Sequence, residues 1–215
     1  MSLFNGRAVI SGVGLSEVGR RIGRSPVALA AEACLAAVSD AGLDLRYIDG
    51  VATHPGEFGR PGYSGAGVYH VKDVWGLSLQ WYLGGAEQAG QLGPVAEASM
   101  AVSSGLATHV LCFRSTWEGT AQAGAGSRGR LLASDHLASG ENQWRQPLGL
   151  FSPAHYFAMY ARRYMHQYGL TREQLAQVAL VDRANAALNS NAIYTSPMTL
   201  DDYLGGRMVT DPLCL

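Results

Sequence analysis

The sequence has few charged residues and few cysteines. Only 15% of its 215 residues are charged, and the formal net charge is −1. This balance provides no basic surface for a phosphate backbone, so it excludes nucleic acid as a main partner. The three cysteines, Cys34, Cys112 and Cys214, are far apart and form no C-x-x-C pair. A disulfide framework and a cysteine-bound zinc ion are therefore excluded, and we expect a protein of the reducing cytoplasm.

Several other signals are absent. The six histidines form no H-x-x-x-H or H-E-x-x-H pair, so we expect no metal site. The longest apolar stretch, residues 27–38, is interrupted by Glu32 and is too short to cross a bilayer. Residues 1–15 lack a secretory cleavage pattern. No G-x-S-x-G elbow is present, which argues against a serine nucleophile.

Glycine, by contrast, is abundant. The chain has 27 glycines, roughly twice the average share of about 7%. There is no G-X-Y period, and apolar residues make up 47% of the sequence, so collagen and disorder are both excluded. The glycines therefore predict a compact fold with tight turns and close approaches between backbone segments.

The first half of the chain alternates short apolar runs with helical patterns. The apolar runs are typical of buried strands, and Ser25-Pro26 is a strong helix start. Strands are expected at residues 8–10, 48–53, 79–83 and 108–113, and helices from Ser25 to Gly42 and over 84–104. This repeated β–α–β order predicts a layered α/β domain with a parallel sheet.

The composition changes after Arg114. Residues 117–130 are rich in Gly, Ala, Ser and Arg, which is typical of a ligand-facing loop. Helices are expected from Ser152-Pro153 to Tyr168, from a capping box at Thr171 to about residue 189, and from Thr199 onward. We therefore divide the chain into a sheet-bearing unit (residues 1–114), a helical insertion (115–198) and a return segment (199–215).

Two features raise the question of a nucleotide-bearing ligand. Gly12, Gly14 and Gly19 follow the first expected strand, but the third glycine is too distant and the helix starts only at Ser25. This spacing differs from the dinucleotide fingerprint, in which the glycines open the helix. Arginines cluster at residues 20–24 and 162–163, which indicates either a solvated basic face or contacts to a ligand phosphate.

The most distinctive local pattern is a series of tyrosines. Tyr156, Tyr160, Tyr164 and Tyr168 are four residues apart, and His155 is adjacent to the first of them. Residues with this spacing share one face of a helix. One interpretation is a packing or subunit-contact face. The other is a pocket in which a phenol or the imidazole acts as a general base or hydrogen-bond donor.

Four motifs follow one another in the second half. They are M-x-x-Y-G at Met165–Gly169, T-x-E at Thr171–Glu173, an asparagine-rich turn at Asn185–Asn191, and D-P-L at Asp211–Leu213. With the opening I-x-G-x-G strand and Ile48–Val51, they resemble the thiolase-like family of sterol carrier protein x and the bacterial lipid-transfer-protein thiolases. The resemblance covers nearly the whole chain. It implies the N-terminal half of a thiolase-like α/β fold, a layered α-β-α sheet unit, with a helical loop-domain insertion.

The chain departs from the thiolase pattern at the position of the nucleophile. The nucleophilic cysteine of a thiolase falls near Ala89, within the segment Gly84–Gly90, and no cysteine stands there. Acyl transfer through an acyl-enzyme needs that thiolate. In this respect the chain is similar to the steroid side-chain retro-aldolases of the same superfamily. These cleave a β-hydroxyacyl-CoA without an acyl-enzyme, and they work with a partner that carries an OB fold and a zinc ribbon.

The resemblance therefore implies retro-aldol carbon–carbon cleavage of a β-hydroxyacyl-CoA such as a steroid side chain, with no cofactor besides the CoA thioester substrate. A thioester enolate forms in this reaction, and backbone N–H groups at a glycine-lined helix start suit its oxyanion. We expect catalytic roles for Tyr156 and His155, which align with pocket residues of the family. The substrate-binding candidates are Gly84, Gly85, Ala89, Gly90, Tyr160, Arg128 and Arg130, with the two arginines placed to meet CoA phosphates.

Family chains run to about twice this length, and their main acid and base residues are mostly in the C-terminal half. We therefore expect either a fragment or a chain completed by another polypeptide. A homodimer through the thiolase-like core and a partner with an OB fold and zinc ribbon are the implied assembly. Two alternatives stay open: thiolase-type acyl transfer in lipid metabolism with a displaced nucleophile, and a non-catalytic subunit that binds acyl-CoA or lipid.

Overall fold

The computed structural model describes residues 6–19, 22–54, 66–85, 90–117, 142–150 and 152–214. The chain divides into two compact units, Met1–Ser127 and Arg128–Leu215, and each is described by itself. The division lies in the Gly- and Ser-rich stretch that follows the sheet. The expected limits at residues 114 and 198 stay a prediction.

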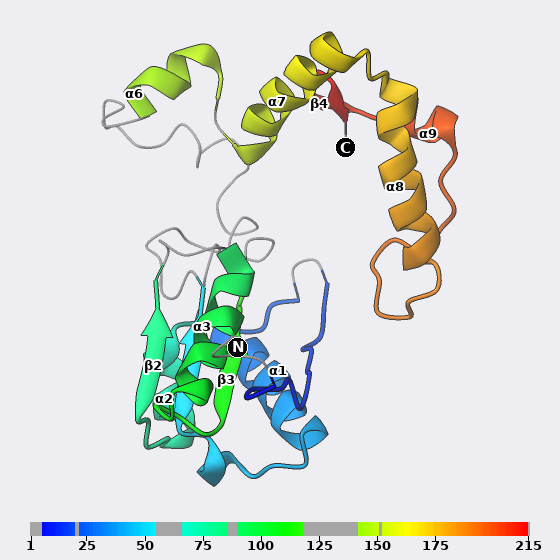
Figure 1. The fold of residues 1–215 in the computed structure, drawn as a ribbon. Helices are drawn as coiled ribbons and strands as arrows, with labels where there is room; N and C mark the ends of the chain where they lie inside the picture. The colour runs from blue at the N-terminus through cyan, green and yellow to red at the C-terminus, as the bar shows by residue number, and fades with distance from the viewer. Residues whose placement is uncertain are drawn as a thin grey trace. The chain divides into compact units, whose positions relative to one another are not determined.

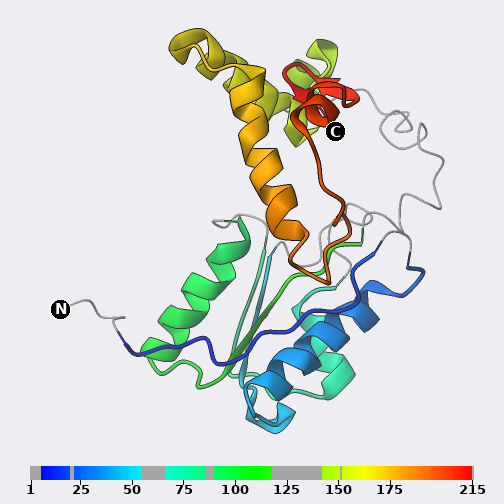
Figure 2. The same cartoon turned by 90° about the vertical axis from the view of Figure 1, so that its right-hand side faces the viewer.

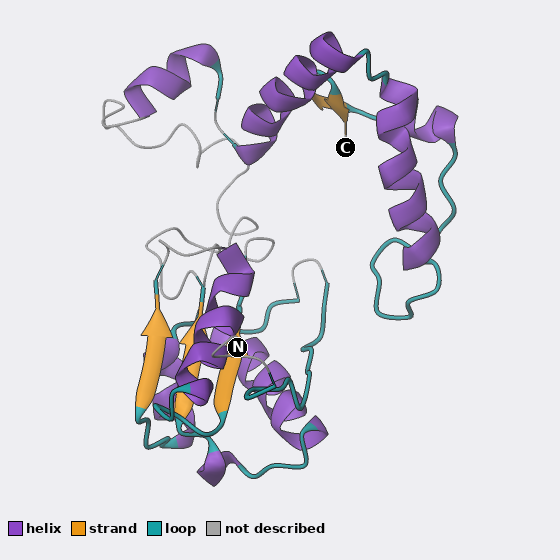
Figure 3. Cartoon of the chain, in the orientation of Figure 1, coloured by secondary structure: helices purple, strands orange, loops and turns teal. Residues whose placement is uncertain are grey.

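The first unit contains a three-stranded parallel sheet (Figures 1 and 3). Its strands are β1 (Gly50–Thr53), β2 (Trp81–Gly84) and β3 (Val110–Phe113), in the order β2-β1-β3. Gly50 is in register with both Trp81 and Val110. The parallel sheet is therefore confirmed for three of the four predicted strands, those at residues 48–53, 79–83 and 108–113.

Helices cover both faces of this sheet. α3 (Gly93–Ser103) lies on one face, and α1 (Pro26–Asp40) and α2 (Val68–Trp75) lie on the other (Figure 2). α1 begins as expected, because the Ser25 hydroxyl accepts a hydrogen bond from the Ala28 N–H at 3.1 Å. Sequence reasoning assigned no helix to residues 68–75, although a glycine stands at each end of α2. Short 3-10 helices occur at η1 (Leu45–Tyr47) and η2 (Gly90–Leu92).

The core lies between the sheet and the pair α1 and α2. It is built from aliphatic side chains and one thiol, which exclude water from both the strands and the helices. Its buried members are Cys34, Val38, Ile48, Val51, Val68, Val71, Leu77 and Leu111. Strands β1 and β3 contribute Val51 and Leu111, so the middle of the sheet is fixed by apolar packing.

The N-terminal segment corrects one prediction. Residues 8–10 form no strand, and the side chains of Val9 and Ile10 are 85% and 75% exposed. The segment instead follows α1, where the Val13 N–H donates to the Asp40 carboxylate at 2.9 Å. A Cβ added at Gly12 would lie 2.3 Å from the carbonyl oxygen of Ala37. The segment therefore packs against the backbone of α1 and donates a hydrogen bond to the Asp40 carboxylate, in place of pairing with a neighbouring strand.

The second unit is mainly helical. It contains α6 (Asn142–Arg145), η3 (Gln146–Leu148), α7 (Pro153–Tyr168), α8 (Arg172–Ala186), α9 (Leu200–Leu204), and the antiparallel strands β4 (Met208–Thr210) and β5 (Leu213–Cys214). The capping box expected at Thr171 is present, because the Thr171 and Gln174 side chains each accept from the other's backbone N–H. The β4–β5 pair was not predicted. In the part of the chain that the structure describes, no helix has the length and apolar character needed to cross a membrane.

Candidate functional site

The carboxyl ends of the three parallel strands form the edge of the sheet at which the candidate site lies. β1 ends at Thr53 and is followed by His54, β2 ends at Gly84, and β3 ends at Phe113. α3 begins at the same edge because it follows β2 along the chain (Figure 1). The chain passes from β1 to β2 on one side and later to β3 on the other. Ligands of parallel α/β sheets bind where the strand order reverses in this way.

Two polar side chains at this edge are buried without a partner. His54 is 8% exposed and Thr53 is fully buried. The Nδ1 atom of His54 and the hydroxyl of Thr53 have no hydrogen-bond partner among the residues that the structure describes. Buried polar atoms of this kind are rare in folded proteins, and each needs an explanation such as a ligand or an ordered water.

A cavity of about 140 Å³ lies beside His54. Its lining residues come from the end of β1, from the end of β3 and from the start of α3; they are His54, Gln91, Pro94, Val95, Cys112, Phe113 and Arg114. Pockets for whole ligands are usually about 300–1,000 Å³. The cavity is therefore large enough for a few heavy atoms, such as the reacting end of a larger substrate.

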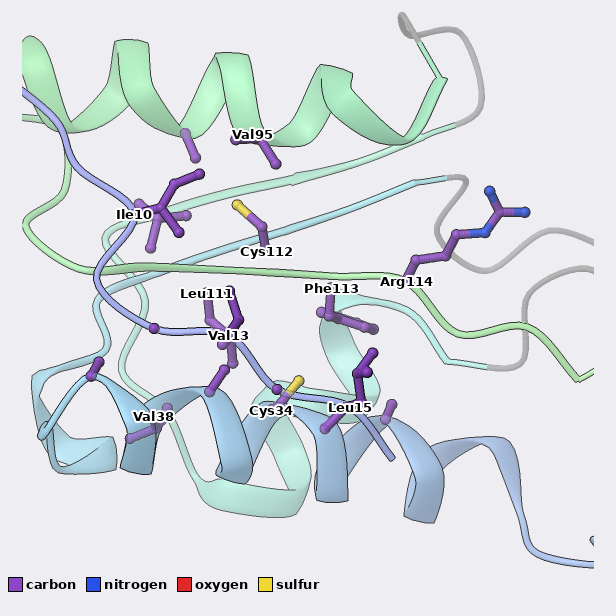
Figure 4. Close-up of a pocket in the computed structure, with 18 of the residues that line it drawn as sticks. Ile10, Val13, Leu15, Cys34, Val38, Val95, Leu111, Cys112, Phe113 and Arg114 are labelled. Atoms are coloured by element: carbon purple, nitrogen blue, oxygen red, sulfur yellow. The ribbon is translucent and has the colours of Figure 1, made fainter. Parts of the chain in front are cut away.

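The charge around this cavity favours a negatively charged group. Arg114 carries a guanidinium and extends from the end of β3 toward the side on which α3 lies (Figure 4). The N-cap of α3 is Leu92, whose side chain cannot accept from the helix N–H groups. The positive end of the helix dipole is therefore not neutralised by its own cap.

The predicted glycines are only partly in the expected setting. Gly84 and Gly85 stand at the carboxyl edge. Gly90 has φ +61°, a left-handed conformation that favours glycine. However, α3 begins at Gly93 and not at residue 84, because the turn at Gly90 and η2 precede it and Pro94 occupies its first turn. Ala89 lies outside the described residues.

Two of the cysteines are held as neutral thiols. Burial raises the pKa of Cys34 to about 12 and that of Cys112 to about 11. The Cys112 thiol also donates to the carbonyl oxygen of Pro94 at 3.7 Å. Because the thiolate is the nucleophilic form, neither side chain is suited to form an acyl-enzyme at neutral pH.

The second unit holds the other predicted site residues, at the start of α7. The Ser152 hydroxyl and His155 Nδ1 are 2.8 Å apart, and the Tyr156 hydroxyl donates to the Leu150 carbonyl oxygen at 3.2 Å. The Arg145 guanidinium lies 5.1 Å from the centre of the Tyr156 ring. Both candidate catalytic groups therefore have local partners, and their catalytic roles stay a prediction.

The remaining tyrosines form an exposed face of α7. Tyr160, Tyr164 and Tyr168 are each more than half exposed. The ring centroids of Tyr164 and Tyr168 are 4.6 Å apart. This agrees with the shared helix face predicted from the spacing, and the contact surface and the pocket stay predictions. Arg128 and Arg130 lie outside the described residues.

A larger apolar groove of about 1010 Å³ runs between the N-terminal segment, α1, α3 and β3. Ile10, Val13 and Leu15 lie along it beside Leu111 and Phe113 (Figure 4). The N-terminal segment thus lies between α1 and β3 and makes no strand pairing with β3 over its described residues.

Sequence reasoning missed His54 and Arg114. Each directly follows a short apolar strand, and the carboxyl end of a parallel strand is where functional side chains gather. Their position directly after a predicted strand is therefore the sequence signal that could have identified them as candidate site residues. Metal-ligand spacing cannot detect a single histidine in a pocket, and His54 has no neighbouring motif such as the tyrosine series beside His155.

Comparisons with known proteins support an aldolase relationship. No family model matches the chain. It is 39% identical over 223 residues to the steroid side-chain-cleaving aldolase of Thermomonospora curvata, and 34% identical over 214 residues to the 17-hydroxy-3-oxo-4-pregnene-20-carboxyl-CoA lyase of Mycobacterium tuberculosis. These alignments cover 100% and 99% of the chain, and 54% of each relative. The chain spans about half the length of these relatives.

Two further matches are a short segment of an acetyltransferase and a solved aldolase structure. A segment is 40% identical over 75 residues to an acetyl-CoA acetyltransferase of Methanothermobacter thermautotrophicus, which covers 35% of the chain and 19% of that protein. Among solved structures, the Ltp2-ChsH2(DUF35) aldolase matches with 37% identity and a TM-score of 0.80, over 100% of this chain and 52% of that one. The chain is therefore homologous to a segment of aldolases and shares their mixed α/β fold.

Proposed function

We propose that the chain is part of a thiolase-like enzyme that cleaves a carbon–carbon bond of a β-hydroxyacyl-CoA, such as a steroid side chain, by a retro-aldol reaction. The observation that carries this proposal is the carboxyl edge of the sheet. It offers groups that favour an oxyanion, while Cys34 and Cys112 are neutral thiols. The names of the two relatives that match over the whole chain, an aldolase and a CoA lyase, support the same reaction class.

The reaction needs a base and an oxyanion site, and no cofactor. A base removes the proton of the β-hydroxyl, and the oxygen electrons form a carbonyl as the Cα–Cβ bond breaks. The electrons of that bond pass to the thioester as an enolate, which is then protonated at Cα. Preorganised donors around the enolate oxygen stabilise the charge as it develops. The products are a ketone or aldehyde and a shortened acyl-CoA.

The other predicted residues enter this proposal in the roles expected from the family resemblance. His155 and Tyr156 are proposed as pocket residues. The Ser152 contact of His155 is made by Nδ1 and is compatible with a base role of the other ring nitrogen, whereas use of Tyr156 as a base requires that its bond to the Leu150 carbonyl be broken. Arg128 and Arg130 are proposed to meet the CoA phosphates.

We further propose a homodimer through the sheet-bearing core and a partner with an OB fold and a zinc ribbon. The solved Ltp2-ChsH2(DUF35) aldolase carries a second component in its name, and this supports the partner.

The test uses the complete assembly that contains this chain, with its partner, and a panel of β-hydroxyacyl-CoA esters. We expect a ketone or aldehyde and a shortened acyl-CoA, detected by liquid chromatography and mass spectrometry. The matched control is the same ester without the β-hydroxyl, which cannot undergo the reaction. If no ester in the panel is cleaved, the proposed reaction is wrong.

Acyl transfer is the second candidate, because a segment of the chain is similar to an acetyl-CoA acetyltransferase. The raised pKa of Cys34 and that of Cys112 predict no acyl adduct after incubation with acyl-CoA at pH 7 to 8. Intact-protein mass spectrometry checks this. A stable adduct on either cysteine would favour acyl transfer over carbon–carbon cleavage.

A further inference from the structure

We propose that His54 binds the thioester carbonyl oxygen of the substrate in the cavity between β1, β3 and the start of α3. This oxygen becomes the enolate oxygen during cleavage. The inference rests on the proposed function for the identity of the substrate, but the site itself is defined by the position of His54 and by its neighbours.

The first argument is the burial of His54. The side chain is only 8% exposed, and its buried Nδ1 has no partner in the part of the chain that the structure describes. An apolar residue would fill this position without the cost of a buried, unpaired nitrogen. A ligand atom that hydrogen-bonds to Nδ1 removes that cost, and the adjacent cavity gives such an atom room.

The second argument is the charge of the neighbouring groups. Arg114 lines the same cavity, as do Gln91 of η2 and Pro94 and Val95 in the first turn of α3. Its described lining residues carry a guanidinium and no carboxylate. A guanidinium and the positive end of a helix both favour an oxygen that gains negative charge.

The third argument is that the cavity suits the thioester group. Its volume of about 140 Å³ is below the range of about 300–1,000 Å³ for whole-ligand pockets. It therefore takes one functional group, while the remainder of an acyl-CoA lies outside it. The thioester carbonyl is the group of this substrate that becomes an oxyanion.

In the reaction His54 keeps its proton. With the proton on Nδ1, the imidazole donates a hydrogen bond to the carbonyl oxygen. This bond strengthens as the electrons of the broken Cα–Cβ bond move onto that oxygen, so it stabilises the transition state more than the bound substrate. The proton added at Cα comes from another group.

The first experiment compares His54→Leu, His54→Asn and the control His109→Asn in the complete assembly with a β-hydroxyacyl-CoA that the wild type cleaves. Removal of one oxyanion donor lowers kcat by about 10²–10³-fold, which we expect for His54→Leu. Asparagine retains an N–H near Nδ1, so His54→Asn should keep kcat within about tenfold of wild type. His109 precedes β3 at the opposite edge of the sheet, and its variant should cleave as the wild type does.

Thermal denaturation of the same variants separates binding from folding. Leucine fills the site and removes an unpaired polar atom, so we expect His54→Leu to melt at the wild-type temperature or above. A purely structural role for His54 predicts the opposite pattern, with a lower melting temperature and wild-type kcat in the folded fraction. An ordered water in the cavity is the other occupant. It predicts wild-type kcat for both His54 variants, and that result would overturn the proposal.

A second readout does not depend on carbon–carbon cleavage. The assembly is incubated with a saturated acyl-CoA in D₂O, and exchange of the Cα protons is followed by mass spectrometry. Exchange passes through the same enolate, so we expect it in the wild type and a loss of about 100-fold in His54→Leu. Exchange without cleavage of any β-hydroxyacyl-CoA would disprove the proposed function alone. Equal exchange in wild type and His54→Leu would disprove the role of His54 alone.

Discussion

The two edges of the parallel sheet differ in how completely their polar groups are paired. At the amino edge the Asp49 carboxylate accepts from the Thr108 N–H at 2.9 Å and from the His109 N–H at 2.8 Å. The backbone oxygen of Asp49 accepts from Gln80 at 2.8 Å, and the Gly50 N–H donates to His109. At the carboxyl edge, a few residues away, buried atoms of Thr53 and His54 have no partner in the described part of the chain.

Within this small sheet, the amino edge contributes to stability, and the carboxyl edge is the one proposed to bind a ligand. A paired edge joins β1, β2 and β3 and resists opening, while an unpaired edge carries a cost that a ligand can remove. The acetyltransferase alternative and the aldolase proposal both need a ligand at this second edge. Substitutions at the two edges should therefore affect different measurements.

The largest effect on stability is expected from Asp49→Ala. Hydrogen bonds to charged groups contribute about 1.5–3 kcal/mol each, so loss of this shared acceptor should lower the free energy of unfolding by about 3 kcal/mol. Urea denaturation measures the change. Asp73→Ala is the control, because among the described residues Asp73 makes only an exposed contact to Lys72 at 3.5 Å, worth about 0–1 kcal/mol. Equal effects of the two variants would contradict the comparison.

The contribution of Asp49 should depend on pH. Partial burial opposes the shift, but the N–H groups of His109 and Thr108 lower the pKa of this carboxyl below its ordinary value of 3.8. A lowered pKa in the folded state stabilises the protein above the ordinary value, and this stabilisation is lost as the pH falls through the folded pKa. The difference in stability between wild type and Asp49→Asn should thus be constant at pH 6–7 and shrink below about pH 4. A constant difference down to pH 2 would exclude the carboxylate as its source.

Gly50 and Gly84 provide a second comparison, between the first residue of β1 and the last residue of β2. A Cβ at Gly50 would lie 2.7 Å from Val110 Cγ2, whereas at Gly84 the nearest atom is Val68 Cγ2 at 3.5 Å. Overpacking costs about 1–3 kcal/mol, so Gly50→Ala should lower the free energy of unfolding by about 2 kcal/mol. Gly84→Ala should keep the wild-type stability, because 3.5 Å is an ordinary van der Waals distance between the added methyl group and Val68. Equal losses of stability in the two variants would contradict this comparison.

The comparison also shows which features could be predicted from the sequence. Ser25-Pro26, the capping box at Thr171 and the apolar run at residues 108–113 are local signals, and the structure contains the expected helices and, over residues 110–113, the strand. The strand over residues 8–10 was wrong because an apolar triplet does not specify a hydrogen-bonding neighbour, and Asp40 took the Val13 N–H instead. His54 was missed because the cavity beside it is completed by residues about 40 and 60 positions away, Pro94 and Arg114.

A hydroxyl that has a hydrogen-bond partner should contribute to the free energy of unfolding, as the paired groups of the amino edge do. The Ser25 hydroxyl accepts from the Ala28 N–H at the start of α1, and loss of such a cap costs about 1 kcal/mol. Ser25→Ala should lower the free energy of unfolding by this amount in urea denaturation and leave the cleavage rate unchanged. Wild-type stability in this variant would mean that other groups cap α1.

The smallest effect is expected from Thr53→Val, and its direction is an increase in stability. The Thr53 hydroxyl is fully buried and unpaired among the described residues, and valine has nearly the same shape. Replacement of an unpaired polar group by an apolar group of the same shape is neutral or stabilising. We therefore expect the free energy of unfolding to rise by up to about 1 kcal/mol, opposite in sign to Ser25→Ala. A loss of stability in Thr53→Val would show that the carboxyl edge is paired as the amino edge is, and the contrast between the two edges would no longer hold.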